Sequence, residues 1–142
     1  MKTTARNRFA GTLSAVQSGP VTTQVTVTTP SGIDIVATMT STAAERLQVA
    51  VGKEAIALIK SSAVVLVADF GGYQLSARNQ FAGTVSRVET GAVSSLIGLT
   101  LAGGEVITAS VTNDAVAALG LAAGQAATAV VKAYSVIVAV RG

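Results

Sequence analysis

The sequence predicts an all-β protein with one short helix in each of two like domains. Two observations support this fold class. Residues 4–68 align with residues 76–140 without a gap, and roughly a third of the aligned pairs are identical, which indicates a tandem duplication. Within each copy, short segments alternate apolar and polar residues between turn signals, as half-buried strands do.

The duplication sets the expected domain organisation. The first domain is expected at residues 1–69 and the second at 76–142, with a short Gly-containing linker at 70–75. Two repeats are too few for a solenoid, so two like domains are the better interpretation.

Five strands are expected in the first copy, and five equivalent strands are expected in the second. Val21, Val25 and Val27 alternate with polar residues, which indicates a strand with one buried face. The turn Pro30-Ser31-Gly32 separates this strand from the next. The expected strands of the first copy are 6–16, 21–29, 33–40, 54–60 and 64–68.

A short helix is expected after the third strand of each copy. Thr42 and Glu45 have the spacing of a capping box, so we expect Thr42 to be the N-cap of the first helix. In the second copy Asn113 or Asp114 is expected to cap, and Gly120 is expected to end the helix. Five short strands with one small helix between the third and fourth match a five-stranded, OB-type Greek-key barrel. The prediction is therefore two such barrels in tandem.

Composition limits the possible functions. Only 12% of the residues are charged, against about 25% in typical soluble domains, so we expect another subunit to cover part of the surface. The net charge of +3 comes without a Lys/Arg run, so neither a nucleic-acid partner nor a membrane partner is expected. The absence of cysteine excludes disulfides and is compatible with the cytoplasm, and the absence of histidine removes the commonest zinc ligand.

Hydrogen-bond donors recur at equivalent positions of the two copies. A hydroxyl, an arginine and an asparagine open each copy, at Thr4, Arg6 and Asn7 in the first. Lys60 ends the fourth expected strand, and Thr40 ends the third. These groups suit a tetrahedral dianion, which offers only acceptors and needs charge-assisted hydrogen bonds to be bound. No carboxylate accompanies them, so neither general-base catalysis nor a Mg²⁺ site is indicated.

Each position also has a simpler structural interpretation. The arginines can be solvated charges, the lysines can protect an edge strand, and the threonines can cap the helices. Gly11 and Gly83 are interpreted as bulge or close-packing glycines, and Phe9 and Phe81 as core residues. The recurrence of the donors in both copies favours the functional interpretation.

Two motifs resemble a known family. Ser76-Ala77-Arg78-Asn79-Gln80 and the later Val130-Val131-Lys132-Ala133 are similar to motifs of the Mop domain of the molbindins. The tandem arrangement resembles the bacterial molybdate-binding proteins that have two Mop domains. The resemblance covers essentially the whole chain, with both copies in register.

The resemblance implies a homotrimer that binds molybdate or tungstate at domain and subunit interfaces, without catalysis and without a cofactor. It implies a role in cytoplasmic molybdenum storage and homeostasis, and sites whose arginine and lysine halves come from different domains or chains. The implied oxyanion ligands are Thr4, Ala5, Arg6, Thr40, Lys60 and Ser61 in the first copy, and Ser76, Ala77, Arg78, Thr112, Lys132 and Ala133 in the second. Further anion sites near a three-fold axis are expected around Gly19, Val21, Gly91 and Val93.

Some positions depart from the family pattern, and two other functions stay open. Thr4 stands where the motif has Ser, Pro20 where it has Ala, and Thr22 and Ser94 where the family often has Asn. One alternative is a molybdate-responsive regulatory module that acts on a separate partner. The other is an OB-type nucleic-acid binder, which is ranked low because the chain has only five aromatic residues.

Overall fold

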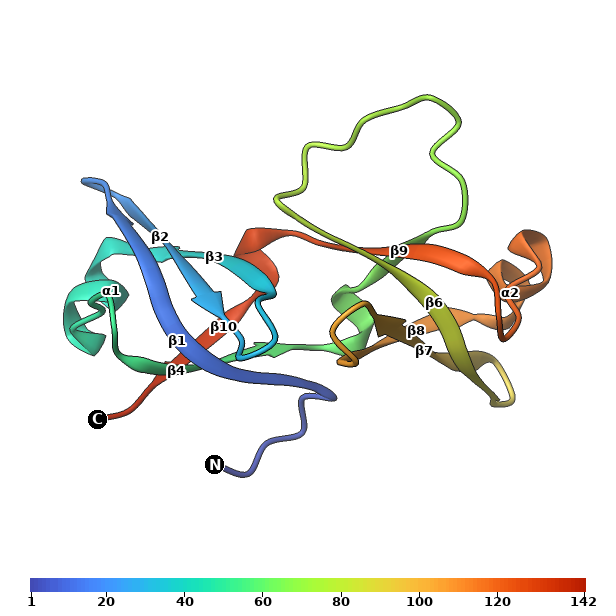
Figure 1. Ribbon diagram of the computed structural model, residues 1–142, viewed down its shortest axis with the longest axis horizontal. Helices are drawn as coiled ribbons and strands as arrows, with labels where there is room; N and C mark the ends of the chain where they lie inside the picture. The colour runs from blue at the N-terminus through green and yellow to red at the C-terminus, as the bar shows by residue number, and fades with distance from the viewer. The chain divides into compact units, whose positions relative to one another are not determined.

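The computed structural model describes residues 1–142 and has an almost entirely β architecture (Figure 1). The all-β prediction is confirmed, with strand ends within two residues of those expected from the first copy. The strands are β1 (Asn7–Ser18), β2 (Thr22–Thr28), β3 (Asp34–Thr40), β4 (Glu54–Ile59), β5 (Val65–Val67), β6 (Asn79–Thr90), β7 (Ser94–Leu101), β8 (Val106–Thr112), β9 (Ala126–Val131) and β10 (Ile137–Val140). The helices are α1 (Ser41–Leu47), α2 (Asn113–Leu119) and the single 3₁₀ turns η1 (Ser61–Ala63) and η2 (Ala133–Ser135).

The strands form two five-stranded sheets, each in its own compact unit. The first unit contains residues 1–59 and 132–142, and its sheet has the order β10-β4-β1-β2-β3. The second unit contains residues 60–131, and its sheet has the order β5-β9-β6-β7-β8. Every neighbouring pair of strands is antiparallel.

The compact units differ from the contiguous ranges 1–69 and 76–142 because the fifth strands are exchanged. β10 pairs with β4 in the first sheet, where Ile137 lies opposite Leu58, and Figure 1 shows these strands side by side. β5 pairs with β9 in the second sheet, where Val65 lies opposite Val130. The two registers are equivalent, since each repeat carries a fifth strand that fits either sheet.

The apolar faces of the strands form the core of each unit. In the first unit, Leu13, Val25 and Ile35 are at most 1% exposed, and Phe9 is buried as expected. Phe81, expected in the core of the second unit, is only half-buried. The buried apolar side chains of the second sheet include Val85, Ile97, Leu99, Ile107 and Ala129.

Val21 does not belong to the buried face that the alternation predicted. It precedes β2 and is 74% exposed, and its equivalent Val93 is 75% exposed. The physical reason is that both residues lie in the turns between long strands, where no second layer covers them. Apolar surface at these two turns is therefore open to solvent in the single chain.

Gly11 and Gly83 allow close approach of strands, as the sequence suggested. A Cβ on Gly11 would lie 2.2 Å from the carbonyl oxygen of Thr28, and a Cβ on Gly83 would lie 2.5 Å from that of Thr100. The register of β1 against β2 shifts between Leu13 and Ala15, which is a β-bulge next to the close approach.

The helix caps correct one expectation. Thr40, not Thr42, is the N-cap of α1, and its Oγ1 accepts a hydrogen bond from the Ala43 amide at 3.1 Å. Thr112, rather than Asn113 or Asp114, caps α2 in the same way. Each strand therefore runs directly into its helix, with the last strand residue as cap. Gly120 ends α2 in a left-handed conformation, as expected.

Neither α-helix is long and apolar enough to cross a membrane.

Candidate anion-binding site

The two arginine segments, Thr4–Arg6 and Ser76–Arg78, immediately precede the first strand of each sheet. Arg6 and Arg78 have exposed side chains, whereas the asparagines that follow them, Asn7 and Asn79, are 2% and 1% exposed. Buried polar side chains must be hydrogen-bonded, so these asparagines are structural residues that fix the start of β1 and β6. The arginine in each motif is thereby held at a defined place on the surface.

The lysines lie at the exits of inner strands. Lys60 follows β4 and Lys132 follows β9, and both are exposed. β4 has β1 on one side and β10 on the other, and β9 lies between β6 and β5. The interpretation that these lysines protect an edge strand is therefore wrong. The residues that follow them are less exposed: Ser61 is half-buried and Ala133 is 8% exposed.

Strand register brings the arginine and the lysine of one repeat to the same end of a strand pair. In the first sheet Asn7 lies opposite Ile59, so Arg6 and Lys60 are the next residues on the two strands. In the second sheet Asn79 lies opposite Val131, which gives Arg78 and Lys132 the same relation.

Thr40 lies at the opposite end of the first sheet from Arg6. Thr40 of β3 lies opposite Thr22 of β2, and the next residue of β2, Thr23, lies opposite Ser18 of β1. Ser18 is the last residue of β1, whereas Arg6 precedes its first residue. β1 has 12 residues, and at about 3.3 Å per residue its two ends are roughly 35 Å apart along the strand. One small anion cannot contact Thr40 and Arg6 of the same unit, and Thr112 and Arg78 in the second unit have the same arrangement.

The amides at the start of each helix are largely used within the protein. The Ser41 amide donates to the carbonyl of Val21 at 2.9 Å, and the Ala43 amide donates to Thr40. These two amides are therefore already hydrogen-bonded within the chain. The Thr40 oxygen accepts one hydrogen bond, which leaves its O–H proton able to donate.

The turns expected to hold further anion sites are tied to the helices. In the first unit Ser41 Oγ donates to the Gly19 carbonyl at 2.6 Å, and in the second Asn113 Nδ2 donates to the Gly91 carbonyl at 2.9 Å. These bonds fix the turns, with Val21 and Val93 at their exposed tips.

Two residues next to the arginine segments make contacts that the sequence did not indicate. Gln80 Nε2 donates to the carbonyls of Leu75 and Ala77, at 3.2 and 3.0 Å. In the first repeat the Ala5 amide donates to Thr3 Oγ1 at 3.2 Å. The signal that could have identified them is a difference between the repeats, because Arg8 aligns with Gln80 and Leu75 aligns with Thr3.

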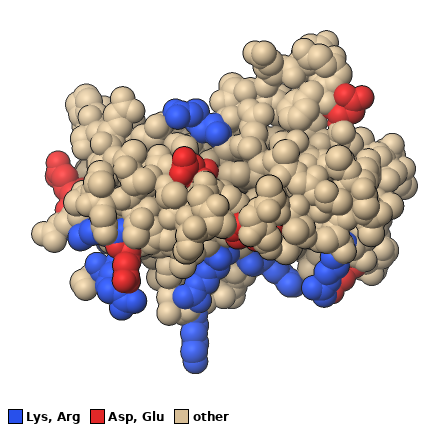
Figure 2. Space-filling model, viewed as in Figure 1, with Lys and Arg blue, Asp and Glu red and all other residues tan.

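The electrostatics of these positions favour an anion. Arg6, Lys60 and Lys132 make no ion pair with a carboxylate of the chain, whose ion pairs include Arg87–Glu89 and Arg141–Glu54. Figure 2 shows that most of the surface on the face in view belongs to uncharged residues, with the Lys, Arg, Asp and Glu side chains scattered among them. No three His, Cys, Asp or Glu side chains lie together in a cluster that could hold a metal ion.

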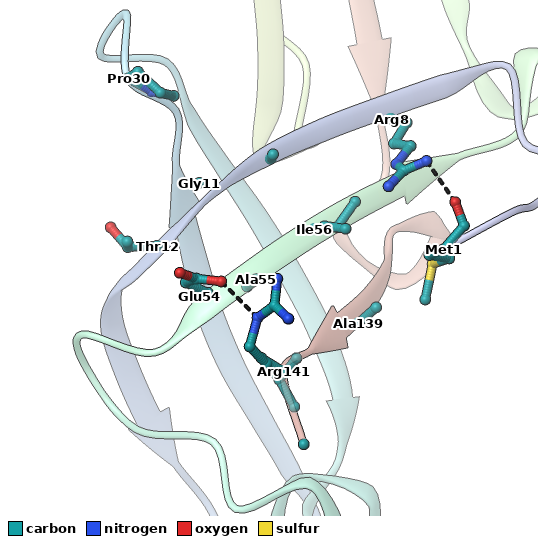
Figure 3. A pocket seen from close by; sticks show the side chains of 13 residues that line it. Met1, Arg8, Gly11, Thr12, Pro30, Glu54, Ala55, Ile56, Ala139 and Arg141 are labelled. Atoms are coloured by element: carbon teal, nitrogen blue, oxygen red, sulfur yellow. Dashed lines mark hydrogen bonds and ion pairs between the residues drawn. The ribbon is translucent and has the colours of Figure 1, made fainter.

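An open groove of about 700 Å³ lies elsewhere, on the outer face of β1, β4 and β10 (Figure 3). Glu54 Oε2 accepts from Arg141 Nε at 2.7 Å on one side, and Arg8 Nη1 donates to the Met1 carbonyl on the other. None of the expected oxyanion ligands lines this groove.

Together, the fold and the surface positions define a class of protein: a tandem β-sheet protein with cationic, donor-rich strand ends and no cluster of metal-ligating side chains. A family model for the TOBE domain matches residues 3–66 and again 75–138. The chain belongs to the TOBE-domain family and carries two such domains in tandem, which confirms the resemblance to tandem Mop-domain proteins.

Three relatives illustrate the similarity. The chain is 70% identical over 141 residues to the molybdenum transport protein ModE of Herbaspirillum seropedicae, and 43% identical over 142 residues to that of Azotobacter vinelandii. These matches cover 99% and 100% of this chain but 52% of each relative, so the chain spans about half their length. A solved structure of the cytoplasmic molybdate-binding protein ModG, with molybdate bound, is 47% identical with a TM-score of 0.95 and covers 99% of this chain and 100% of that one.

Proposed function

We propose that the chain binds molybdate, and tungstate with it, as intact oxyanions and without catalysis, in cytoplasmic molybdenum storage and homeostasis. The observation that carries the proposal is the match over both full chains to ModG with molybdate bound. The donor set supports it independently, because Arg6, Lys60 and Lys132 supply positive charge and make no ion pair with a carboxylate of the chain. Tungstate has nearly the same size and charge, so a hydrogen-bond cage hardly separates the two ions.

The binding residues in this proposal are the twelve positions identified from the motifs. Arg6 and Arg78 supply planar guanidinium groups, and Lys60 and Lys132 supply ammonium groups. Hydroxyls of Thr4, Ser76, Thr40, Thr112 and Ser61 and the amides of Ala5, Ala77 and Ala133 complete the donor set. Together they would replace the hydration shell of a buried dianion.

A second copy of the chain is needed in this proposal to complete each site. Thr40 lies at the far end of β1 from Arg6, so both can serve one anion only if they come from different copies. The homotrimer implied by the family resemblance would supply those copies. Exposed apolar side chains support an assembly: Val21, Val51, Val65, Val93, Tyr134 and Ile137 are each more than half exposed.

Calorimetric titration tests the proposal. The purified chain is titrated with molybdate, with tungstate in parallel and with sulfate and phosphate as controls, and metal content is measured afterwards. We expect saturable molybdate and tungstate binding and much weaker binding of sulfate and phosphate. Absence of saturable molybdate binding, or equal binding of phosphate, would overturn the proposal.

Paired substitutions test the site. Arg78→Ala with Lys132→Ala is expected to lower the number of anions bound per chain, because it removes both charges of one strand end. Arg87→Ala is the matched control, since Arg87 is an exposed arginine of the second unit, like Arg78, and pairs with Glu89. Unchanged stoichiometry in the double variant would place the site elsewhere.

A second candidate function is a molybdate-responsive module that acts on a separate partner. The observation that favours this second function is the 70% identity to a relative that is named a molybdenum transport protein. A storage protein is expected to bind and release the anion without a partner protein. A sensor is expected to have a partner protein whose affinity for this chain changes when molybdate is bound. Co-purification with and without molybdate separates the two candidates.

A further inference from the structure

The two arginine segments differ in how they are held before any anion arrives. In the second repeat, Gln80 Nε2 donates to the carbonyls of Leu75 and Ala77. These carbonyls bracket the peptide that joins Ser76 to Ala77. A side-chain amide has two N–H donors, so one group can satisfy both carbonyls at once and fix the bracketed peptide.

Gln80 is itself firmly placed. It is the second residue of β6 and lies opposite Val130 of β9, so its backbone belongs to an inner strand of the sheet. Its two hydrogen bonds therefore connect the Ser76–Arg78 segment to the sheet. The Ala77 amide, a proposed anion donor, is held in one orientation as a consequence.

The first repeat has neither feature. Arg8 stands in the place of Gln80, and its Nη1 donates to the Met1 carbonyl, four residues before Ala5. The Ala5 amide donates to Thr3 Oγ1. Leu75 occupies the equivalent position in the second repeat and has no side-chain acceptor. An anion that takes the Ala5 amide must first displace the Thr3 hydroxyl.

We propose that Gln80 is a positioning residue that pre-organises the Ser76–Arg78 segment, and that Thr3 is an internal competitor that weakens the Thr4–Arg6 segment. The proposal rests on the proposed molybdate binding and divides the sites into two classes. Sites built on Ser76–Arg78 bind molybdate more tightly and fill first, because groups held in place before binding lose less conformational freedom. Sites built on Thr4–Arg6 fill at higher molybdate concentration.

Calorimetry with molybdate on single variants tests the two roles separately. Gln80→Leu keeps the size of the side chain but removes its donors, and is expected to weaken the tighter class of sites about tenfold, as loss of two hydrogen bonds would. The weaker class is expected to keep its affinity, which a general folding defect would not allow. Thr3→Val keeps the shape but removes the acceptor, and is expected to tighten the weaker class several-fold.

Exchange of the aligned residues provides a further control. Gln80→Arg is expected to behave like Gln80→Leu, whereas Arg8→Gln is expected to tighten the first-repeat sites. In the anion-free protein, the NMR order parameter of the Ala77 amide is expected to fall in Gln80→Leu while that of Ala5 does not change.

The outcomes separate this inference from the proposed function. If the unsubstituted chain does not bind molybdate, the proposed function fails and the inference with it. If it binds molybdate in a single class of sites, or if Gln80→Leu and Thr3→Val leave both affinities unchanged, only the inference is overturned. Loss of affinity in both classes with Gln80→Leu would also overturn it.

Discussion

Ile137 lies opposite Leu58, so the last strand of the chain completes the sheet that the first strand begins. The same relation joins Val65 to Val130 in the other sheet. Each unit of the structure therefore contains a strand from the other sequence repeat. The second unit is one contiguous piece of chain, residues 60–131, whereas the first unit is assembled from two pieces, residues 1–59 and 132–142.

Deletion of residues 136–142 is expected to destabilise the first unit selectively. The deletion removes β10, which leaves one edge of β4 without its hydrogen-bond partners and uncovers Leu58. Native-state hydrogen exchange should show faster exchange in β4 and β1. The strands β9 and β6 of the second sheet serve as the internal control, because β5 still covers β9. Equal loss of protection in both sheets would contradict the exchanged-strand arrangement.

Gly11→Ala is expected to destabilise the chain by about 1–3 kcal/mol, the usual cost of overpacking. The new Cβ would lie 2.2 Å from a backbone carbonyl oxygen of β2, which cannot move aside without shifting the strand. Gly98→Ala is the matched control in β7, since the nearest atom to its new Cβ is at 3.3 Å and belongs to the Arg87 side chain. Urea unfolding of both variants measures the difference. A Gly11→Ala variant as stable as Gly98→Ala would show that the two strands are not so close.

Much of the fold could be predicted from the sequence because its signals are local. The alternation around Val25 and Val27, the turn at Gly32 and the left-handed Gly120 each depend on a few adjacent residues. Which fifth strand completes which sheet could not be predicted, because the repeats make the two strands interchangeable in register. The sequence alone does not separate Thr40 from Thr42 as the N-cap, because both are threonines and only the end of β3 at Thr40 selects it.

The candidate site was predictable where the two repeats agree and not where they differ. Arg6, Lys60 and their equivalents stand out because cations recur at the same positions in a chain with little charge. Gln80 aligns with an arginine and Thr3 with a leucine in the other repeat. Residues shared by the two repeats therefore do not include them. Their roles depend on hydrogen bonds to backbone groups two to five residues away, which form only in the folded chain.

The ion pair between Arg141 and Glu54 is expected to contribute little to stability. Both side chains are mostly exposed, at 80% and 67%, so water screens the attraction. A double-mutant cycle with Arg141→Ala and Glu54→Ala is expected to give a coupling free energy below about 1 kcal/mol that shrinks further in high salt. Thermal unfolding of the four proteins measures it. A coupling several times larger would mean that the pair organises the groove of Figure 3 more strongly than its exposure indicates.

Thr40 is expected to have two separable roles, as a helix cap and as a proposed anion donor. Thr40→Val keeps the shape but removes the acceptor for the Ala43 amide, and should cost about 0.5–2 kcal/mol of stability, the range measured for lost N-caps. Thr40→Ser retains the hydroxyl and should be close to the unsubstituted chain in both stability and molybdate binding. Thr42→Val, at the exposed position that the capping-box spacing indicates, is the matched control and should leave stability nearly unchanged. Urea unfolding without anion measures the contribution of the cap to stability. Molybdate titration without denaturant, well below the unfolding temperature, measures the contribution of the hydroxyl to anion binding. If Thr40→Val unfolds like Thr42→Val, the cap assignment is wrong, whatever the titration gives.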